Sequence, residues 1–267
     1  MHSAIHHPAS LPDPHRRFLD AAVAQLARDR RLVGVAAGGS YLSDTMDAQS
    51  DLDLVVVTEP DAHATVMTQR HDIAASLGPL LCAFTGEHVG EPRLLVCLYD
   101  APLLHVDLKF VALPDVALRV EDPAILFDRD GRIAASLATG RAVYPAPDPQ
   151  WIEDRFWVWV HYGGSKIERG EVFETLAMLS FLRESVLGPL ALRRAGARPS
   201  GVRRIETVAP AFATRLQATV AACSCEDCLR ALHACVALYR ELRVFDASFA
   251  QRSAVEAAAT RYLDSLD

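Results

Sequence analysis

The sequence predicts an α+β protein, in which a mixed β-sheet domain with flanking helices is followed by an α-helical bundle domain. Short apolar runs bounded by glycine, proline or aspartate recur between residues 32 and 112, as expected for buried strands. Beyond residue 150 the apolar residues recur at helical spacing instead. A proline-rich segment, 144–149, separates the two patterns, so we predict domains at 15–145 and 150–267.

Composition limits the classes of function. The 267 residues suffice for one large domain or two smaller ones. A net charge of −7 disfavours a protein whose main partner is a nucleic-acid backbone. The chain shows no uninterrupted apolar stretch of about 18–20 residues and no signal-peptide pattern. With six cysteines and no secretory signal, we predict reduced thiols, a cytoplasmic location and no membrane partner.

The first domain is predicted from alternating helical and strand patterns. Residues 1–14, rich in histidine and proline, are expected to form a flexible tail. The expected helices are 15–30, 41–48 and 61–77. The expected strands are 32–37, 51–57, 80–84, 94–99 and 103–112, with two shorter ones at 117–120 and 125–127.

The second domain is predicted to be an antiparallel bundle. Its expected helices are 151–169, 171–187, 207–223, 226–245 and 248–266, with a short helical turn at 189–195. Gly188-Pro189 is expected to end the second helix, and Ser224 with Asp227 forms a capping pair for the fourth. Cys223, Cys225 and Cys228 lack the second ligand pair of a structural zinc site, so core thiols are the preferred interpretation.

The turn Gly38-Gly39-Ser40 lies between an expected strand and an expected helix. Such a turn presents backbone N–H groups and a hydroxyl at a helix start, where anions bind. Ten residues later, Asp51 and Asp53 begin a strand and point to the same face because side chains alternate. Two adjacent carboxylates repel each other, so this pair indicates a divalent cation between them.

A Gly-Ser turn followed after about ten residues by Asp-x-Asp on a strand resembles the nucleotidyltransferase superfamily, with the DNA polymerase β-like fold. Within it, the chain is most similar to bacterial nucleotidyltransferases that modify aminoglycoside and lincosamide antibiotics. The resemblance implies Mg²⁺-dependent transfer of a nucleoside monophosphate, foremost AMP from ATP, to a hydroxyl of a small acceptor. One or two Mg²⁺ ions would be held by Asp51 and Asp53, and the phosphates by Gly38, Gly39 and Ser40.

The strand 105–110 alternates strictly, with His105, Asp107 and Lys109 on one face. An exposed edge strand would show the same pattern, with its polar face in water. The resemblance instead implies a third carboxylate at Asp107, either as a metal ligand or as the general base. Glu153 or Asp154, offered from the second domain, are the alternatives for the base.

Lysine occurs only at Lys109 and Lys166, against 25 arginines among the 27 basic residues, which suggests positions where a compact ammonium is needed. Arg155, Trp159, Tyr162 and Lys166 form one helical stripe, which could line a nucleotide cleft or an interface. We predict that Lys109, Lys166 and Arg155 bind the nucleotide, with the two lysines stabilising the leaving group.

The predicted partners are therefore a nucleoside triphosphate and a small hydroxylated acceptor, and a homodimer is compatible with the sequence. Two rival functions stay open. A non-catalytic nucleotide sensor or scaffold would not need a third carboxylate. The other rival is an enzyme that modifies a protein or nucleic-acid hydroxyl, of which the acidic net charge disfavours only the nucleic-acid version. Magnesium-dependent release of pyrophosphate with different acceptors distinguishes these functions.

Overall fold

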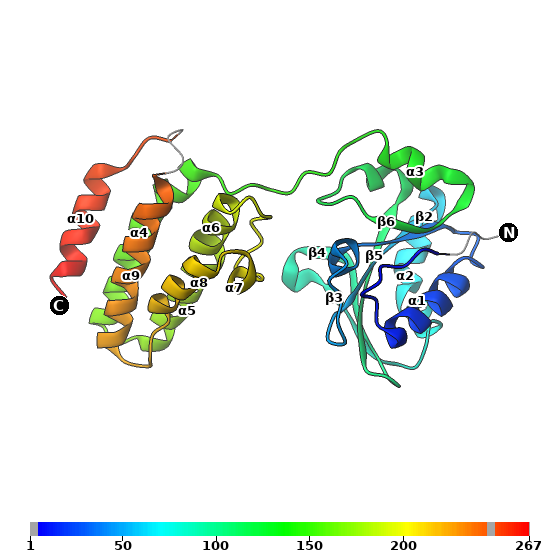
Figure 1. The fold of residues 1–267 in the computed structure, drawn as a ribbon, viewed down its shortest axis with the longest axis horizontal. Helices are drawn as coiled ribbons and strands as arrows, with labels where there is room; N and C mark the ends of the chain where they lie inside the picture. Colours follow the sequence, from blue (N-terminus) through cyan, green and yellow to red (C-terminus); the bar gives the residue numbers. More distant parts are fainter. Residues whose placement is uncertain (1–4, 245–248, 267) are drawn as a thin grey trace. The chain divides into compact units, whose positions relative to one another are not determined.

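The computed structural model describes residues 5–244 and 249–266 (Figure 1). The chain divides into two compact units, Met1–Tyr144 and Pro145–Asp267. The first contains a mixed β-sheet with flanking helices, and the second is helical in its described part. The predicted fold class is confirmed.

The sheet of the first unit has six strands in the order β3-β4-β5-β2-β1-β6. Their bounds are β1 Leu32–Ala37, β2 Leu52–Thr58, β3 Leu80–Gly86, β4 Glu91–Tyr99, β5 Leu104–Ala112 and β6 Ala124–Asp128. Strands β2 and β5 are parallel neighbours, whereas the other paired strands are antiparallel. Because β5 lies between β4 and β2, it is an interior strand, and its interpretation as an exposed edge strand is wrong.

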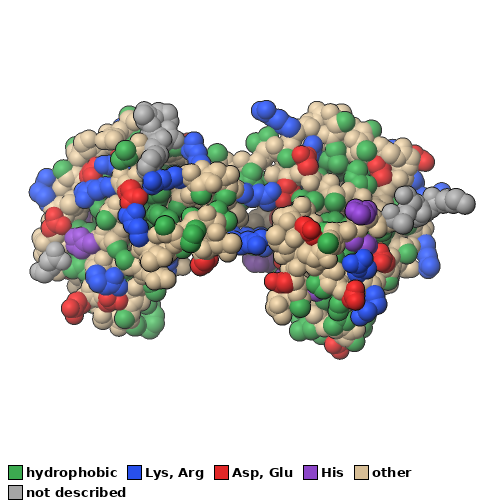
Figure 2. Space-filling model, in the orientation of Figure 1, with side chains coloured by type: hydrophobic (Ala, Val, Ile, Leu, Met, Phe, Trp, Pro, Cys, Tyr) green, Lys and Arg blue, Asp and Glu red, His purple; other side chains and the backbone are tan. Residues whose placement is uncertain are grey.

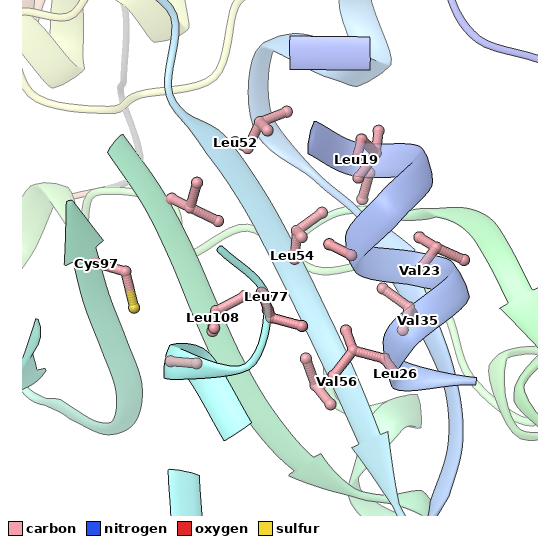
Figure 3. Close-up of a cluster of buried hydrophobic side chains, with 14 of the residues drawn as sticks. Leu19, Val23, Leu26, Val35, Leu52, Leu54, Val56, Leu77, Cys97 and Leu108 are labelled. Atoms are coloured by element: carbon pink, nitrogen blue, oxygen red, sulfur yellow. The ribbon is translucent and has the colours of Figure 1, made fainter. Parts of the chain in front are cut away.

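One face of this sheet is covered by α1 (Asp13–Leu26) and α2 (His63–Ala75). Leu19, Val23 and Leu26 of α1 recur at helical spacing and pack toward Leu54 and Val56 of β2 (Figure 3). The side chains of β2 and β5 alternate, so that every second one enters this core. The side chains at these alternate positions of β2 and β5 are buried in this core, so the polar residues between them point to the opposite face of the sheet.

The opposite face is covered over only part of its length. Val57 and Val111 pack there with Val116 of η4 (Leu113–Ala117) and Ile133 of α3 (Arg132–Leu137). Helix α3 was not predicted, because its six residues are too few for a clear helical period. The strand predicted at 117–120 is absent, because the chain leaves η4 there as a loop. This partial cover leaves the beginnings of β2 and β5 exposed on that face.

The helical unit is built around a long apolar core. Its helices are α4 Pro149–Glu168, α5 Val172–Leu182, α6 Gly188–Arg194, α7 Ile205–Val208, α8 Pro210–Leu216, α9 Cys225–Arg243 and α10 Ser253–Asp264. Phe156 of α4 stacks on Tyr239 of α9 with ring centroids 3.8 Å apart. Cys228 and Cys235 are buried in this core, as predicted, and Cys225 is partly buried. Cys223 is exposed before α9, so its prediction as a core thiol is wrong. Ser224 caps α9 by accepting a hydrogen bond from the Asp227 N–H at 3.2 Å.

Two helix boundaries in this unit differ from the prediction. Gly188-Pro189 does not end a helix, because the π-helical turn Arg183–Leu187 joins α5 to α6. Gly188 is needed for close packing instead, since a Cβ there would lie 2.3 Å from the Gly201 carbonyl oxygen. The helix expected at 207–223 is divided into α7, α8 and the short η7 (Gln217–Thr219), because Pro210 begins a new helix.

The continuous helical stretch Val172–Arg194 is long and apolar enough, by length and composition, to cross a bilayer. Half of its most apolar part is buried within the unit's own core, as in core helices of globular proteins. The predicted helix termini at 245 and 248 lie outside the described residues. Residues 249–252 are not helical, so the last helix begins at Ser253, later than predicted. On the face shown in Figure 2, acidic and basic side chains are interspersed over each unit.

The N-terminal segment differs from the predicted flexible tail over its described part, which begins at Ile5. His7 contacts the Tyr41 hydroxyl through Nδ1 and the Asp20 carboxylate through Nε2, each at 2.9 Å. Leu11 is only 3% exposed because it joins the core beneath α1. Polar partners for the histidine and an apolar anchor hold the segment against the sheet unit. His2 lies outside the described residues.

Candidate functional site

The carboxylates of β2 and β5 meet because these strands are parallel neighbours. Their register pairs Asp53 directly with Asp107. Adjacent strands lie about 4.8 Å apart, so the two side chains stand next to each other on the face that the helices α1 and α2 do not cover. Asp51 directly precedes β2 and is partly buried. The three predicted acids therefore lie at the same end of two neighbouring interior strands, where β2 and β5 begin.

Asp107 is in a partly desolvated environment. Burial raises the pKa of its carboxyl, because the charged form loses contact with water. The nearby imidazole of His105, whose Nε2 lies 3.0 Å from Oδ1, opposes this shift, whereas the charge of Asp51 adds to it. Asp107 is thus sensitive to the charge of Asp51, as expected for acids that share one site.

The glycine turn packs directly against Asp53. The Gly38 N–H donates to the Asp53 carbonyl oxygen at 2.9 Å, which ties the turn to β2. Gly39 has a φ of +61°, and a Cβ at this position would lie 1.9 Å from Asp53 Oδ2. Only glycine fits there, for both conformational and steric reasons. The turn leads into η1 (Gly39–Ser43), a 3₁₀ helix that is shorter than the expected helix at 41–48.

Ser40 contributes a buried polar atom to the turn. Its Oγ is buried and has no hydrogen-bond partner in the described part of the chain. A buried hydroxyl without a partner costs free energy, so such groups are commonly completed by a ligand. A phosphate oxygen, which accepts strong hydrogen bonds, would satisfy this hydroxyl.

A cavity of about 280 Å³ in the sheet unit is lined by Gly38 of the glycine turn but not by Ser40 or Asp51. Asp53, Asp107 and Lys109 line it, together with apolar side chains such as Leu94 and Val116. The charged residues that line it and were missed by the sequence analysis are Glu91, Arg93, Arg119 and Glu121. Glu91 lies before the strand predicted at 94–99, and only the longer β4 of the structure places it on this face.

Lys109 is balanced by an acid in the same cavity. Its Nζ lies 2.8 Å from Glu91 Oε2, and Arg93 Nε donates to Glu91 Oε1 at 2.7 Å. The hydrogen bond from Arg93, followed by that from Lys109, lowers the pKa of Glu91 to about 2 against the effect of burial. Glu91 thus remains ionised at neutral pH and holds both cations at the cavity wall.

Comparison with known families finds a match within the sheet unit. Residues 20–79, which contain the glycine turn and Asp51 and Asp53, match the nucleotidyltransferase domain family. The match ends before β5, so it does not include Asp107. This finding confirms the resemblance and the enzyme class predicted from the sequence.

Among solved structures, the chain is similar to an aminoglycoside 6-adenyltransferase from Bacillus subtilis, with 13% identity, 93% of this chain and 97% of that chain covered, and a TM-score of 0.43. It is also similar to a nucleotidyltransferase-like protein from Exiguobacterium sibiricum 255-15, with 15% identity, 84% and 74% coverage, and a TM-score of 0.39. A search of curated protein sequences gives no significant match.

The fit of this nucleotidyltransferase domain to a divalent cation can be judged from its donors. Within residues 5–244 and 249–266, no group of three or more His, Cys, Asp or Glu side chains is arranged to hold a metal ion. Magnesium, however, is usually bound by one or two carboxylates together with substrate phosphates. The adjacent carboxylates of Asp53 and Asp107, with Gly38 of the glycine turn lining the same cavity, fit that mode of binding.

Arg155 and Lys166 belong to the helical unit. The Arg155 guanidinium lies over the Trp151 ring, 4.3 Å from its centroid. Lys166 Nζ lies 2.7 Å from Glu171 Oε2 and 3.1 Å from Glu174 Oε2, and these hydrogen bonds raise its pKa. Both cations have local partners, and their role toward the nucleotide stays a prediction.

The two alternative bases also lie in the helical unit. Glu153 is 1% exposed, and its carboxylate accepts hydrogen bonds from Tyr239 Oη at 2.7 Å and Trp157 Nε1 at 3.1 Å. A carboxylate enclosed in this way cannot reach a substrate, so the proposal of Glu153 as a base is wrong. Asp154 is paired with Arg252 Nε at 2.6 Å.

Substitution of Ser40 by alanine tests the phosphate-binding turn. We expect nucleotide affinity to fall by roughly 1–3 kcal/mol, the loss of one hydrogen bond to a charged group. The melting temperature should not fall, because the buried hydroxyl has no partner to lose. Calorimetric titration with ATP measures the affinity, and Ser43→Ala, a change in the same 3₁₀ helix, is the control. Equal affinities of Ser40→Ala and the wild type would remove Ser40 from the site.

Proposed function

We propose that the protein transfers a nucleoside monophosphate, foremost AMP from ATP, to a hydroxyl of a small molecule in a Mg²⁺-dependent reaction. The observation that carries this proposal is the parallel register that pairs Asp53 with Asp107 beside the glycine turn. Nucleotidyl transfer needs a bound triphosphate, an aligned acceptor oxygen and neutralised charge. The nucleotidyltransferase domain has a candidate group for each requirement.

Gly39 and Ser40 would bind phosphate oxygens through the backbone N–H and the unpartnered hydroxyl. Asp51 and Asp53, with Asp107 as a third candidate, would hold one or two Mg²⁺ ions, which would neutralise charge on the triphosphate. Lys109, positioned by Glu91, would stabilise the leaving pyrophosphate from the cavity wall. Lys166 and Arg155 are proposed to contact the nucleotide from the helical unit.

Asp107 is our candidate for the group that accepts the proton of the acceptor hydroxyl. Burial raises its pKa above that of a free aspartate, which brings a carboxylate closer to the strength that a general base needs near neutral pH. Because Asp107 is the direct neighbour of Asp53, a proposed metal ligand, the base would lie next to the reacting phosphate. Service as a metal ligand is the other role open to Asp107.

The acceptor class rests on the sequence resemblance. We propose a hydroxylated compound of the aminoglycoside or lincosamide type, with ATP as the first candidate donor. A cytoplasmic location agrees with the cysteines, all of which are free thiols. Homodimer formation stays a prediction.

Release of pyrophosphate, measured with and without Mg²⁺ against a panel of hydroxylated acceptors, tests the function. The panel should contain aminoglycosides, lincosamides, simple polyols and a protein acceptor, with each nucleoside triphosphate in turn. Turnover with a small molecule supports the proposal. Nucleotide binding without turnover would indicate a sensor, and turnover with the protein acceptor alone would indicate a protein-modifying enzyme.

Substitution of Asp107 by asparagine should lower turnover by roughly a hundredfold or more, the usual contribution of a general base. Stability should be kept or slightly raised, because removal of a buried charge relieves its desolvation. Steady-state kinetics and thermal melting measure the two effects, and Asp115→Asn, at an exposed position in η4, is the control. A destabilised Asp107→Asn protein that keeps its activity per folded molecule would contradict the assignment.

A further inference from the structure

A carboxylate of the chain itself occupies the glycine turn. Glu121 Oε1 accepts a hydrogen bond from the Gly39 N–H at 2.9 Å. A Cβ at Gly38 would lie only 2.7 Å from the same oxygen, so the carboxylate rests closely against both glycines. Glu121 also lines the cavity that contains Asp53 and Asp107. The Glu121 carboxylate therefore accepts the hydrogen bond of the Gly39 N–H, which the proposed function assigns to a phosphate oxygen.

Glu121 lies on the loop between η4 and β6, whose base is firmly attached. Arg119 donates to the Ala117 and Gly140 carbonyl oxygens at 3.2 and 3.1 Å, and its own carbonyl accepts from the Val143 N–H at 2.9 Å. On either side of Arg119, Leu118 and Val120 are 86% and 48% exposed, so little of the protein packs against these side chains. The loop can therefore carry Glu121 away from the turn while Arg119 keeps its base in place.

We propose that Glu121 is an internal competitor of the triphosphate, which must leave the Gly39 N–H when nucleotide binds. This inference rests on the proposed function. A single N–H donates fully to one acceptor, and the Glu121 carboxylate would repel a phosphate placed next to it. The apparent nucleotide affinity is then the intrinsic affinity reduced by the fraction of molecules in which the turn is open. Glu121 thus sets the nucleotide concentration at which the site fills.

Two substitutions of Glu121 separate its charge from its hydrogen bond. Glu121→Ala removes both, whereas Glu121→Gln keeps an acceptor oxygen without the charge. Asp122→Ala is the matched control, because it removes the same charge from the adjacent position, where the carboxylate is 73% exposed, pairs with Arg119 and does not line the cavity. The probes are ATP with Mg²⁺ in the absence of acceptor, and inorganic tripolyphosphate, each titrated by calorimetry.

We expect Glu121→Ala to bind both probes about three- to tenfold more tightly than the wild type, by removal of the competing state. An equal gain for ATP and tripolyphosphate is expected, because the competition concerns the phosphates and not the base. Asp122→Ala should bind like the wild type. Equal or weaker binding by Glu121→Ala than by the wild type would overturn the inference while the proposed function stands. Failure of every variant to bind either probe would overturn both.

Discussion

Replacement of Asp53 by asparagine should abolish Mg²⁺-dependent turnover. Asp53 is next to Asp107 in the register of the sheet and packs against Gly39 of the glycine turn, so it links the proposed metal ligands to the proposed phosphate-binding turn. An amide keeps the shape of the side chain but binds a hard divalent cation far more weakly than a carboxylate does. Turnover is measured as pyrophosphate release over a range of Mg²⁺ concentrations.

The same substitution should leave the melting temperature unchanged or raise it, because one of several neighbouring negative charges is removed. Asp61→Asn, at an exposed position before α2, is the control for loss of a carboxylate elsewhere in the sheet unit. A strongly destabilised Asp53→Asn protein would show that Asp53 serves a structural ion pair. Full activity of a folded Asp53→Asn protein would exclude it as a metal ligand.

The largest expected effect on stability concerns Glu153. Its buried carboxylate accepts hydrogen bonds from Tyr239, Trp157, Arg243 and the Arg252 N–H, which links α4, α9 and the start of α10. Glu153→Ala would leave these donors without their acceptor in the core. We expect the free energy of unfolding of the helical unit to fall by about 3–5 kcal/mol, the usual cost of breaking a buried charge network.

Denaturant unfolding of Glu153→Ala measures this loss, and Glu206→Ala, an exposed glutamate of α7, is the control. The pH dependence gives a second readout. Burial alone would raise the pKa of Glu153, but the hydrogen bonds, led by that of Tyr239, lower it overall. The stabilisation is therefore complete above the unfolded pKa of about 4.3 and is lost as the pH falls through the folded value. A variant with unchanged stability at pH 7 would contradict the network.

The site's centre could be predicted from sequence because it depends on local patterns. A glycine pair before a serine and two aspartates on alternate strand positions identify the turn and β2 without tertiary information. Asp107 could be predicted for the same reason, since the strict alternation in β5 shows on which face of the strand Asp107 lies. Alternation does not show which residues lie next to that face of β5. They are known only once β5 is placed between β4 and β2.

The residues that sequence reasoning missed reach the site from distant segments. Glu91 lies at the start of β4, and Glu121 on a loop that follows β5 by way of η4. Neither has a neighbouring motif, and each meets its partner only once the sheet is assembled. Glu153 was misinterpreted for the opposite reason, since a carboxylate on a helix does not reveal whether the helix turns it toward solvent or into a core.

The parallel pairing of β2 with β5 has a consequence for how the protein folds. All of α2, β3 and β4 must be made and crossed over before β5 can lie against β2, so the pair is a contact of high sequence separation. Such contacts form late, because the entropy of closing the long intervening loop is lost before the contact free energy is gained. Asp53 and Asp107 therefore come together only when the sheet is nearly complete, and a partly synthesised chain carries separate acids without an assembled catalytic centre.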